Sequence, residues 1–314
     1  MSRRGRNVTT TLAAPHPSIR LPSKSARRFH ADRLFAPLAA LLTALVMLVV
    51  FGVPLVFSLW LSFRGWTSDE GPFASRFIGL ENYVDLLTDD RFVSSMLLSL
   101  CYTAGTVAAE LLSGLAIALL LNTDVPGIAL FRTILTVPMM MTPIVAALCW
   151  KLLFDPAHGV INALLGTNIV WLGAPAPAIA AVSFVNVWQS APYVAVLLLA
   201  GLRSLPREPL EAAAIDGGSS WQIFRFVVLP MLRPFVVVAL LLRTIFEFRA
   251  FENVYVLTGG GPADSTMLIS LYTYTTSFLS FDLGLGAASS WMMLLVSLLL
   301  CASFILVLRR RGAA

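Results

Sequence analysis

The chain has 314 residues, of which 58% are hydrophobic and only 12% are charged, and its mean hydropathy is +0.82. A soluble domain carries about 25% charged residues, so this chain has too few polar side chains to cover its apolar ones in water. The net charge of +5 is concentrated at one end, because eight of the 22 Lys and Arg residues lie within residues 1–33. Composition therefore excludes most soluble enzymes and predicts an all-α, polytopic membrane protein.

The N-terminal segment, residues 1–33, is polar and basic and has no apolar periodicity, which predicts a disordered cytoplasmic tail. The uncharged run that follows, from Leu34 to Phe63, is 30 residues long. The apolar core of a signal peptide is about 7–15 residues long. This run is therefore expected to be a retained membrane span.

Membrane-spanning helices need about 20 apolar residues. Six stretches reach that length and together form a transmembrane domain over residues 34–308: about 35–62, 92–121, 130–150, 176–202, 227–250 and 284–308. The fifth contains two prolines and the charged pair Arg243 and Glu247. Residues 309–314 follow the last span as a short C-terminal segment.

The distribution of positive charge predicts the orientation. With six spans, 16 Lys and Arg residues lie on the side of the two termini and five on the opposite side. Positively charged loops remain in the cytoplasm. Both termini are therefore expected to be cytoplasmic, as are residues 309–314 and the loop over residues 203–230.

That loop has the composition of helix, sharp turn, helix. Glu211 and the three alanines after it favour a helix, and Gly217-Gly218 can end it in the left-handed conformation. Ser219 and Gln222 have the spacing of a capping box that starts a second helix. Such a short helix at a fixed angle could fit a groove on another protein, or it could simply join two spans; the physical argument favours neither.

The loop resembles the EAA loop of binding-protein-dependent ABC importer permeases. The residues that match are Glu211, Ala212, Ala213, Asp216, Gly217, Leu229, Pro230 and Pro234. Further stretches resemble the carbohydrate-type subfamily that contains the maltose-type first permease: Phe131-Arg132-Thr133, Pro138, Trp150, Gly201-Leu202 and the segment from Leu257 to Pro262. The resemblance covers about residues 30–308.

This resemblance implies a type I ABC importer permease in a bacterial cell membrane, with six spans. It implies that residues Glu211 to Gly217, with Leu229 and Pro230, dock on a cytoplasmic ABC ATPase dimer. It further implies a second, homologous permease and an extracytoplasmic sugar-binding (lipo)protein. The permease would bind no cofactor itself, since ATP is used by the ATPase, and the sequence contains no GxxxxGK[ST] motif.

The fourth span carries a polar stripe. Asn186, Gln189 and Tyr193 are spaced i, i+3 and i+7 and therefore share one helix face, with Trp188 beside them. Amides and aromatic rings suit the hydroxyls and apolar face of a sugar, but amides also join helices in lipid, and the second interpretation is slightly favoured. Arg243 and Glu247 are expected to form an internal ion pair in the path.

Other ionisable residues offer little chemistry. Glu110 is expected to be a hydrogen-bond acceptor in helix packing rather than a proton relay. Three scattered histidines and three cysteines in apolar runs suggest no metal site.

The favoured function is therefore translocation of a di- or oligosaccharide, or of a related polyol or glycerol phosphate, driven by a separate ATPase. The alternative is a self-sufficient secondary transporter or channel, which would have only Glu110, Arg243 and Glu247 to bind a coupling ion. A membrane-embedded enzyme would need a paired catalytic set, and none is recognisable. No partnership with nucleic acid is indicated.

Overall fold

The computed structural model describes residues 28–67, 75–123 and 126–312. Most of the predicted N-terminal tail, residues 1–27, lies outside these ranges. The described chain is helical apart from a two-stranded antiparallel sheet, in which Arg64–Gly65 (β1) pairs with Arg76–Phe77 (β2). It divides into two units, Met1–Leu55 and Val56–Ala314.

The first unit contains helix Arg28–Met47 (α1), the π-turn Leu48–Gly52 (η1) and the start of helix Val53–Leu61 (α2). Because α1 begins at Arg28, the prediction of a disordered tail up to residue 33 is wrong for residues 28–33. A candidate membrane span of 25 residues runs from Pro37 to Leu61, and the most apolar part of this helix buries no side chain.

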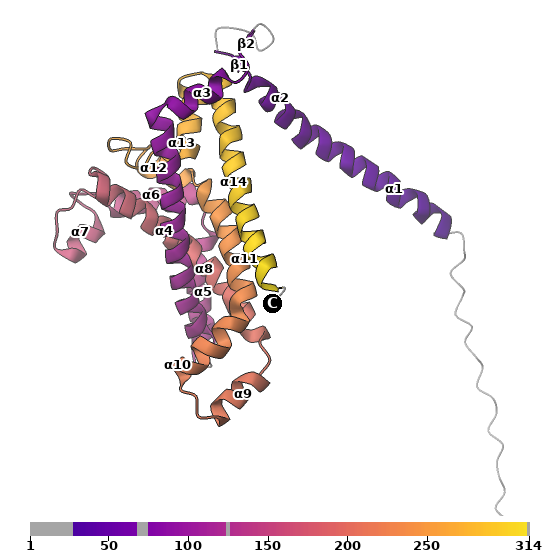
Figure 1. The fold of residues 1–314 in the computed structure, drawn as a ribbon. Coiled ribbons are helices and arrows are strands. Elements are labelled where there is room, and N and C mark those ends of the chain that lie inside the picture. The colour runs from indigo at the N-terminus through magenta and orange to yellow at the C-terminus, as the bar shows by residue number, and fades with distance from the viewer. Residues whose placement is uncertain (1–27, 68–74, 124–125, 313–314) are drawn as a thin grey trace, which may run out of the picture. The chain divides into compact units, whose positions relative to one another are not determined.

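The second unit is built around long helices that pack side by side (Figure 1). Three of them are uninterrupted: Asp90–Leu121 (α4), Pro175–Ser204 (α8) and Leu283–Gly312 (α14). Helix α4 packs mainly against α8, and the two backbones approach closely at Gly114, where an added Cβ would lie 2.6 Å from a Val194 methyl. Small residues allow such approaches between membrane helices.

The predicted third span is broken. It consists of helix Ile128–Met140 (α5) and helix Pro143–Leu153 (α6), which meet at an angle of 100°. The cause is local, because Pro143 is the first residue of α6 and forces the preceding Thr142 into an extended conformation (φ −67°, ψ 142°). The predicted span over about 130–150 therefore corresponds to two helices with a sharp bend between them, and their crossing of the membrane as one span stays a prediction.

The fifth span is helical from Ser220 to Phe248 and longer than predicted. It comprises helix Ser220–Ile223 (α10), the π-turn Phe224–Val228 (η2) and helix Leu229–Phe248 (α11). Pro230 lies just after the π-turn, whose wider hydrogen-bonding pattern accommodates the missing N–H, and the helix continues through it.

Shorter helices connect the spans. They are Glu81–Thr88 (α3), Val160–Leu165 (α7), Glu208–Ile215 (α9), Glu252–Leu257 (α12) and Ile269–Tyr274 (α13), the last continued by the π-turn Thr275–Leu279 (η3). Helices α3 and α9 lie at opposite ends of this unit (Figure 1).

Two apolar cores position the polar residues. One core contains Phe92, Val185 and Phe248, and the other contains Ala118, Val194 and Ala239. Each core takes one of these residues from α4, one from α8 and one from α11. The polar residues of the three helices lie between the two cores in sequence, so the polar cluster is enclosed by apolar packing from both sides.

Candidate functional site

A buried ion triad joins α4 to α11. Arg243 donates two hydrogen bonds to Glu110, through Nε at 2.8 Å and Nη2 at 2.9 Å, and a third to Glu247 one turn further along its own helix. Glu110 is fully buried, and Glu247 and Arg243 are only 3% and 8% exposed. A buried charge is tolerated only with such partners.

The structure thus contains the predicted pair between Arg243 and Glu247. Glu110 is a hydrogen-bond acceptor between helices, as predicted, but its partner is the guanidinium of Arg243, a pairing that no spacing in the sequence indicates.

Side-chain amides extend the triad across α8. Asn186 donates through Nδ2 to Glu247 and to the hydroxyl of Tyr102. Asn253 on α12 donates to Asn186 Oδ1 at 2.7 Å and to Gln189 Oε1 at 3.2 Å. Gln189 in turn donates to the backbone carbonyl of Met141, at the break between α5 and α6, at 3.0 Å.

One continuous chain of hydrogen bonds therefore runs from α4 through α11, α8 and α12 to the break in the third span. It ties the break at Met141, and the two helices on either side of residues 249–251, to the uninterrupted α8.

A pocket of about 690 Å³ opens beside this chain. Its lining includes five residues predicted for the substrate path: Asn186, Gln189, Tyr193, Arg243 and Glu247. Further lining side chains are Phe246, Phe251, Arg249, Glu252 and Asn253. The arrangement combines amide donors and acceptors with aromatic rings, which is suitable for a molecule that has both hydroxyls and an apolar face.

The structure does not place Trp188 in this pocket. Its ring lies 5.3 Å from that of Trp150, edge to face, in an aromatic group between α6 and α8. The prediction that it borders the substrate path therefore finds no support in the geometry. Asn186 and Gln189 join helices and also line the pocket, so the geometry is compatible with both interpretations.

Asn253 is the residue that sequence reasoning missed. Hydropathy places it in the external segment after span five, whereas the structure folds α12 back so that only 5% of Asn253 is exposed. The only available signal was an amide directly before the apolar run from Val254 to Leu257.

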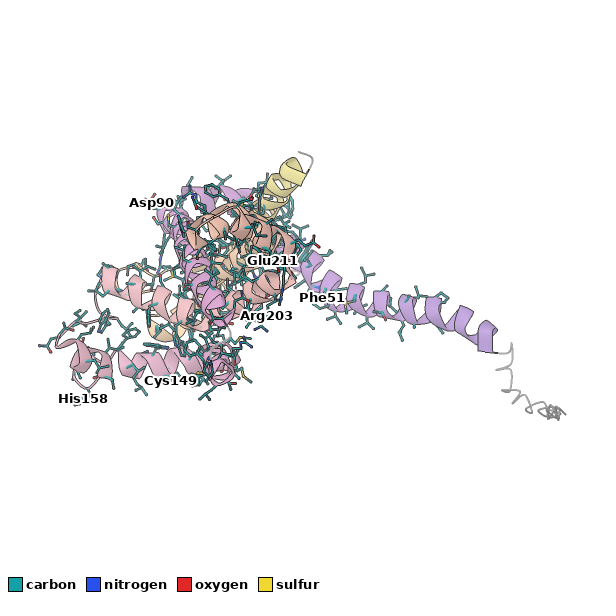
Figure 2. All side chains as sticks on the ribbon, turned by 90° about the horizontal axis from the view of Figure 1, so that it is seen from below. Phe51, Asp90, Cys149, His158, Arg203 and Glu211 are labelled. Carbon is teal, nitrogen blue, oxygen red and sulfur yellow. The ribbon has the colours of Figure 1, made fainter. Side chains whose placement is uncertain are left out.

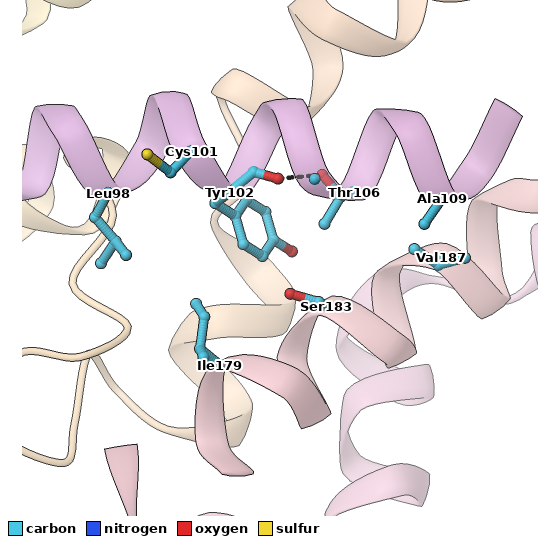
Figure 3. Close-up of a pocket in the computed structure, with 9 residues that line it drawn as sticks. Leu98, Cys101, Tyr102, Thr106, Ala109, Ile179, Ser183 and Val187 are labelled. Atoms are coloured by element: carbon cyan, nitrogen blue, oxygen red, sulfur yellow. Dashed lines mark hydrogen bonds between the residues drawn. The ribbon is translucent and has the colours of Figure 1, made fainter. Parts of the chain in front are cut away.

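A second pocket, of about 380 Å³, lies between α4 and α8 (Figure 3). Its walls are mostly apolar or small, and they contain no charged side chain: Leu98, Cys101, Tyr102, Gly105, Thr106, Ala109, Ile179, Ser183 and Val187. It offers far fewer hydrogen-bonding groups than the larger pocket, so the larger one is the better candidate for a polar ligand.

The loop at the α9 end has the local structure that its sequence indicates. Gly217 ends α9 with φ at +81°, and the N–H of Gly218 donates to the carbonyl of Ala213 at 3.0 Å. Ser219 and Gln222 form the predicted capping box, which starts α10. Pro209 lies in the first turn of α9, where no N–H is needed.

The surface of this loop is exposed and partly apolar. Glu211, Ala212, Asp216, Gly217, Leu229 and Pro230 are exposed, and Ala213 is half-buried. Ile215, Trp221 and Phe226 are 86%, 65% and 69% exposed. Figure 2 shows this end of the molecule from below, with Glu211 labelled. Ile215 lies outside the candidate spans, whereas Trp221 and Phe226 lie at the start of the fifth; an exposed apolar patch at such a helix end is typical of a protein interface.

At the opposite end, polar contacts hold the turn after α12 against α4. Arg91 forms a bidentate pair with Asp264, at 2.9 and 3.0 Å. The hydroxyl of Tyr272 donates to Asp89 at 2.6 Å. Burial, together with this hydrogen bond, raises the pKa of Tyr272.

Comparison with known proteins identifies this architecture. Residues 110–310 match the family described as "Binding-protein-dependent transport system inner membrane component". The chain is 39% identical over 266 residues to the probable ABC transporter permease protein y4oQ of Sinorhizobium fredii, covering 83% of this chain and 86% of that protein. It is 36% identical over 273 residues to the trehalose/maltose transport system permease protein MalF of Thermococcus litoralis, covering 85% and 90%.

A solved structure has the same fold. It is that of a bacterial ABC transporter involved in the import of the acidic polysaccharide alginate, with a TM-score of 0.77 at 20% identity, over 90% of this chain and 99% of that chain. Together, these matches show that the chain belongs to the family of inner-membrane components of binding-protein-dependent transport systems.

Proposed function

We propose that this permease translocates an uncharged sugar, delivered by an external binding protein, through the pocket between α8, α11 and α12. The observation that carries the proposal is the convergence of Asn186, Gln189 and Tyr193 with aromatic rings on one pocket of about 690 Å³. Relatives support it, since one is named as a trehalose/maltose permease and another, from Mycobacterium tuberculosis, as a trehalose permease.

The charges around the pocket favour a neutral substrate. Arg243 and Arg249 are balanced by Glu247 and Glu252 in the lining, and Arg243 is further engaged by Glu110. No guanidinium is left in excess to bind a phosphate. A disaccharide or oligosaccharide therefore fits better than a glycerol phosphate, while Tyr193, Phe246 and Phe251 can stack on the apolar face of a sugar ring.

The loop over residues 203–230, which contains α9 and is called the α9 loop below, would couple the permease to ATP hydrolysis. We infer that Glu211, Ala212, Ala213, Asp216 and Gly217, with Leu229 and Pro230, dock on a cytoplasmic ATPase. Movement of that docked helix would pass along α10 and α11, because these form one continuous span that also carries Arg243 and Glu247. The permease itself binds no ATP in this account.

The assembly that we propose contains a second, homologous permease, an ATPase dimer and an extracytoplasmic binding protein. A solved alginate ABC transporter that shares this fold was crystallised with an alginate pentasaccharide-bound periplasmic protein. In the proposed orientation, both termini and the α9 loop face the cytoplasm, in agreement with the charge distribution of the sequence.

The test is uptake of radiolabelled trehalose and maltose by proteoliposomes that contain the complete complex, with binding protein outside and ATP inside. Uptake that requires both ATP and the binding protein is expected. Uptake driven by an ion gradient without ATP would instead support the secondary-transporter alternative, and uptake of neither sugar would contradict the proposed substrate.

A further inference from the structure

The side-chain amides of Asn186 and Gln189 on α8 are each oriented by a group that can only accept hydrogen bonds. Gln189 Nε2 donates to the carbonyl of Met141, so Oε1 of Gln189 points away from that carbonyl. Asn186 Nδ2 donates to Glu247, whose other carboxylate oxygen accepts from Arg243, so Oδ1 of Asn186 points away from Glu247. Neither amide can turn over without setting two oxygens against each other.

Asn253 closes this arrangement. The two amide oxygens both face its side chain, and only an N–H can satisfy them, so Nδ2 donates to both, at 2.7 Å and 3.2 Å. Asn253 Oδ1 is buried and has no hydrogen-bond partner among the residues that the structure describes. Asn253 thus gives both of its donors to the α8 amides, although an unpaired buried acceptor is unfavourable.

We propose that Asn253 is a positioning residue of the pocket. It acts with the carbonyl of Met141 and with Glu247 to hold Asn186 and Gln189 in one amide orientation, and it thereby fixes the hydrogen-bonding pattern that a sugar meets. With these hydrogen bonds from Asn253 in place, Gln189 keeps one free N–H. The amide oxygens of Asn186 and Gln189 each keep one lone pair. A sugar hydroxyl can accept from the first and donate to the second. The nature of the ligand rests on the proposed function; the positioning does not.

A purely structural role makes a different prediction. If Asn253 only ties α12 to α8, its loss should lower stability and leave the affinity of the pocket unchanged. If it positions the amides, replacing its N–H donors with a carboxylate should repel the two amide oxygens and displace both amides from their present orientation. The affinity of the pocket should then fall.

The chain offers a matched control. Asn82 is also 5% exposed, and its Nδ2 also donates two hydrogen bonds, to the carbonyls of Ser62 at 2.9 Å and Arg64 at 3.0 Å. It does not line the pocket. Asn253→Asp and Asn82→Asp therefore each remove two buried donors while keeping the size of the side chain, and only the first change faces the pocket.

The measurement is protection of a pocket thiol by trehalose in the complete complex, without the binding protein. Cys101, Cys149 and Cys301 are replaced by Ala, and Ser190→Cys reports on the pocket that Ser190 lines. The trehalose concentration that halves the rate of maleimide labelling should rise at least about tenfold with Asn253→Asp and less than about twofold with Asn82→Asp. Equal responses of the two variants would overturn the proposal.

Two further readouts keep the outcome decisive. If trehalose and maltose fail to protect even the unmodified pocket, the sugar assignment fails, and the labelling rate without sugar then decides: Asn253→Asp should change it at least about threefold and Asn82→Asp should not. If the Asn253→Asp complex does not assemble, Asn253→Ala removes the donors without adding a charge, and the same comparison with Asn82→Ala applies.

Discussion

The α9 loop and the polar pocket are built by opposite means. The loop depends on contacts between residues close in sequence, such as the capping box of Ser219 and Gln222 and the glycine that ends α9. The pocket depends on contacts between distant residues: Glu110 meets Arg243 across 133 positions and Gln189 meets Met141 across 48. Residues of the loop can therefore be changed without unfolding the protein, whereas the residues of the pocket also hold the helices together.

From this contrast we expect Arg243→Leu to have the largest effect, which is a loss of stability. The change leaves Glu110 and Glu247 buried without their cation, and breaking a buried pair by removing one partner costs about 3–5 kcal/mol. We expect loss of monodisperse protein in fluorescence-detected size-exclusion chromatography after mild heating. Arg249→Leu is the control, because Arg249 lines the same pocket but is exposed; similar behaviour of the two variants would contradict the structural role of the triad.

The loop should respond differently, through function with intact folding. Gly217→Asp places a side chain at φ +81°, where space is open, so the backbone cost is only about 1 kcal/mol. We expect uptake to fall at least about tenfold at normal abundance in the membrane, because the docking surface is altered.

Gly127→Asp is the matched control for this change. Gly127 also has a positive φ, of +89°, with nothing within 4 Å of an added Cβ, and it belongs to the connection before α5. Near-normal uptake is expected. If both aspartates abolish uptake, the effect comes from glycine replacement in general and not from the coupling loop.

Close packing beneath the pocket predicts an intermediate effect. Gly114→Ala would bring a methyl to 2.6 Å from Val194, whereas Gly105→Ala on the same helix meets nothing within 4 Å. Overpacking costs about 1–3 kcal/mol, while alanine in an open helical position costs nothing. The midpoint of thermal unfolding should therefore fall for Gly114→Ala alone, and equal midpoints would contradict the helix contact.

Tyr193→Ala is expected to have the smallest effect. The side chain is half-buried and lines the pocket, so its loss removes a stacking surface worth about 1 kcal/mol. Uptake should fall several-fold, with the thermal midpoint unchanged. If uptake stays at the unmodified level, Tyr193 does not contact the sugar.

Features that depend on residues close in sequence could be predicted, and those that depend on distant residues could not. Apolar length predicted the spans, and Gly217, Ser219 and Gln222 predicted the loop, because these signals act over a few residues. The break in the third span had a local signal, Pro143, but an apolar average over 130–150 conceals it. The π-turn before Pro230 could not be read from composition, because it depends on how the helix absorbs one missing hydrogen bond.

The pocket was only half predictable. Helical spacing placed Asn186, Gln189 and Tyr193 on one face, and the spacing of Arg243 and Glu247 predicted their pair. Nothing in the sequence connects Glu110 with Arg243 or brings Asn253 to α8, because these contacts depend on how helices pack in three dimensions. Trp188 lies outside the pocket lining although it is adjacent to the stripe in sequence, because neighbouring residues on a helix face different directions.

The most direct test of the whole account separates the two regions in one experiment. The ATPase retained on affinity-tagged permease is measured beside sugar uptake, for Tyr193→Ala and for Gly217→Asp. The account predicts that Tyr193→Ala retains the ATPase at the unmodified level while uptake falls, and that Gly217→Asp loses both. Retention of the ATPase by Gly217→Asp, or its loss in Tyr193→Ala, would contradict the assignment of coupling to the α9 loop and of sugar passage to the pocket.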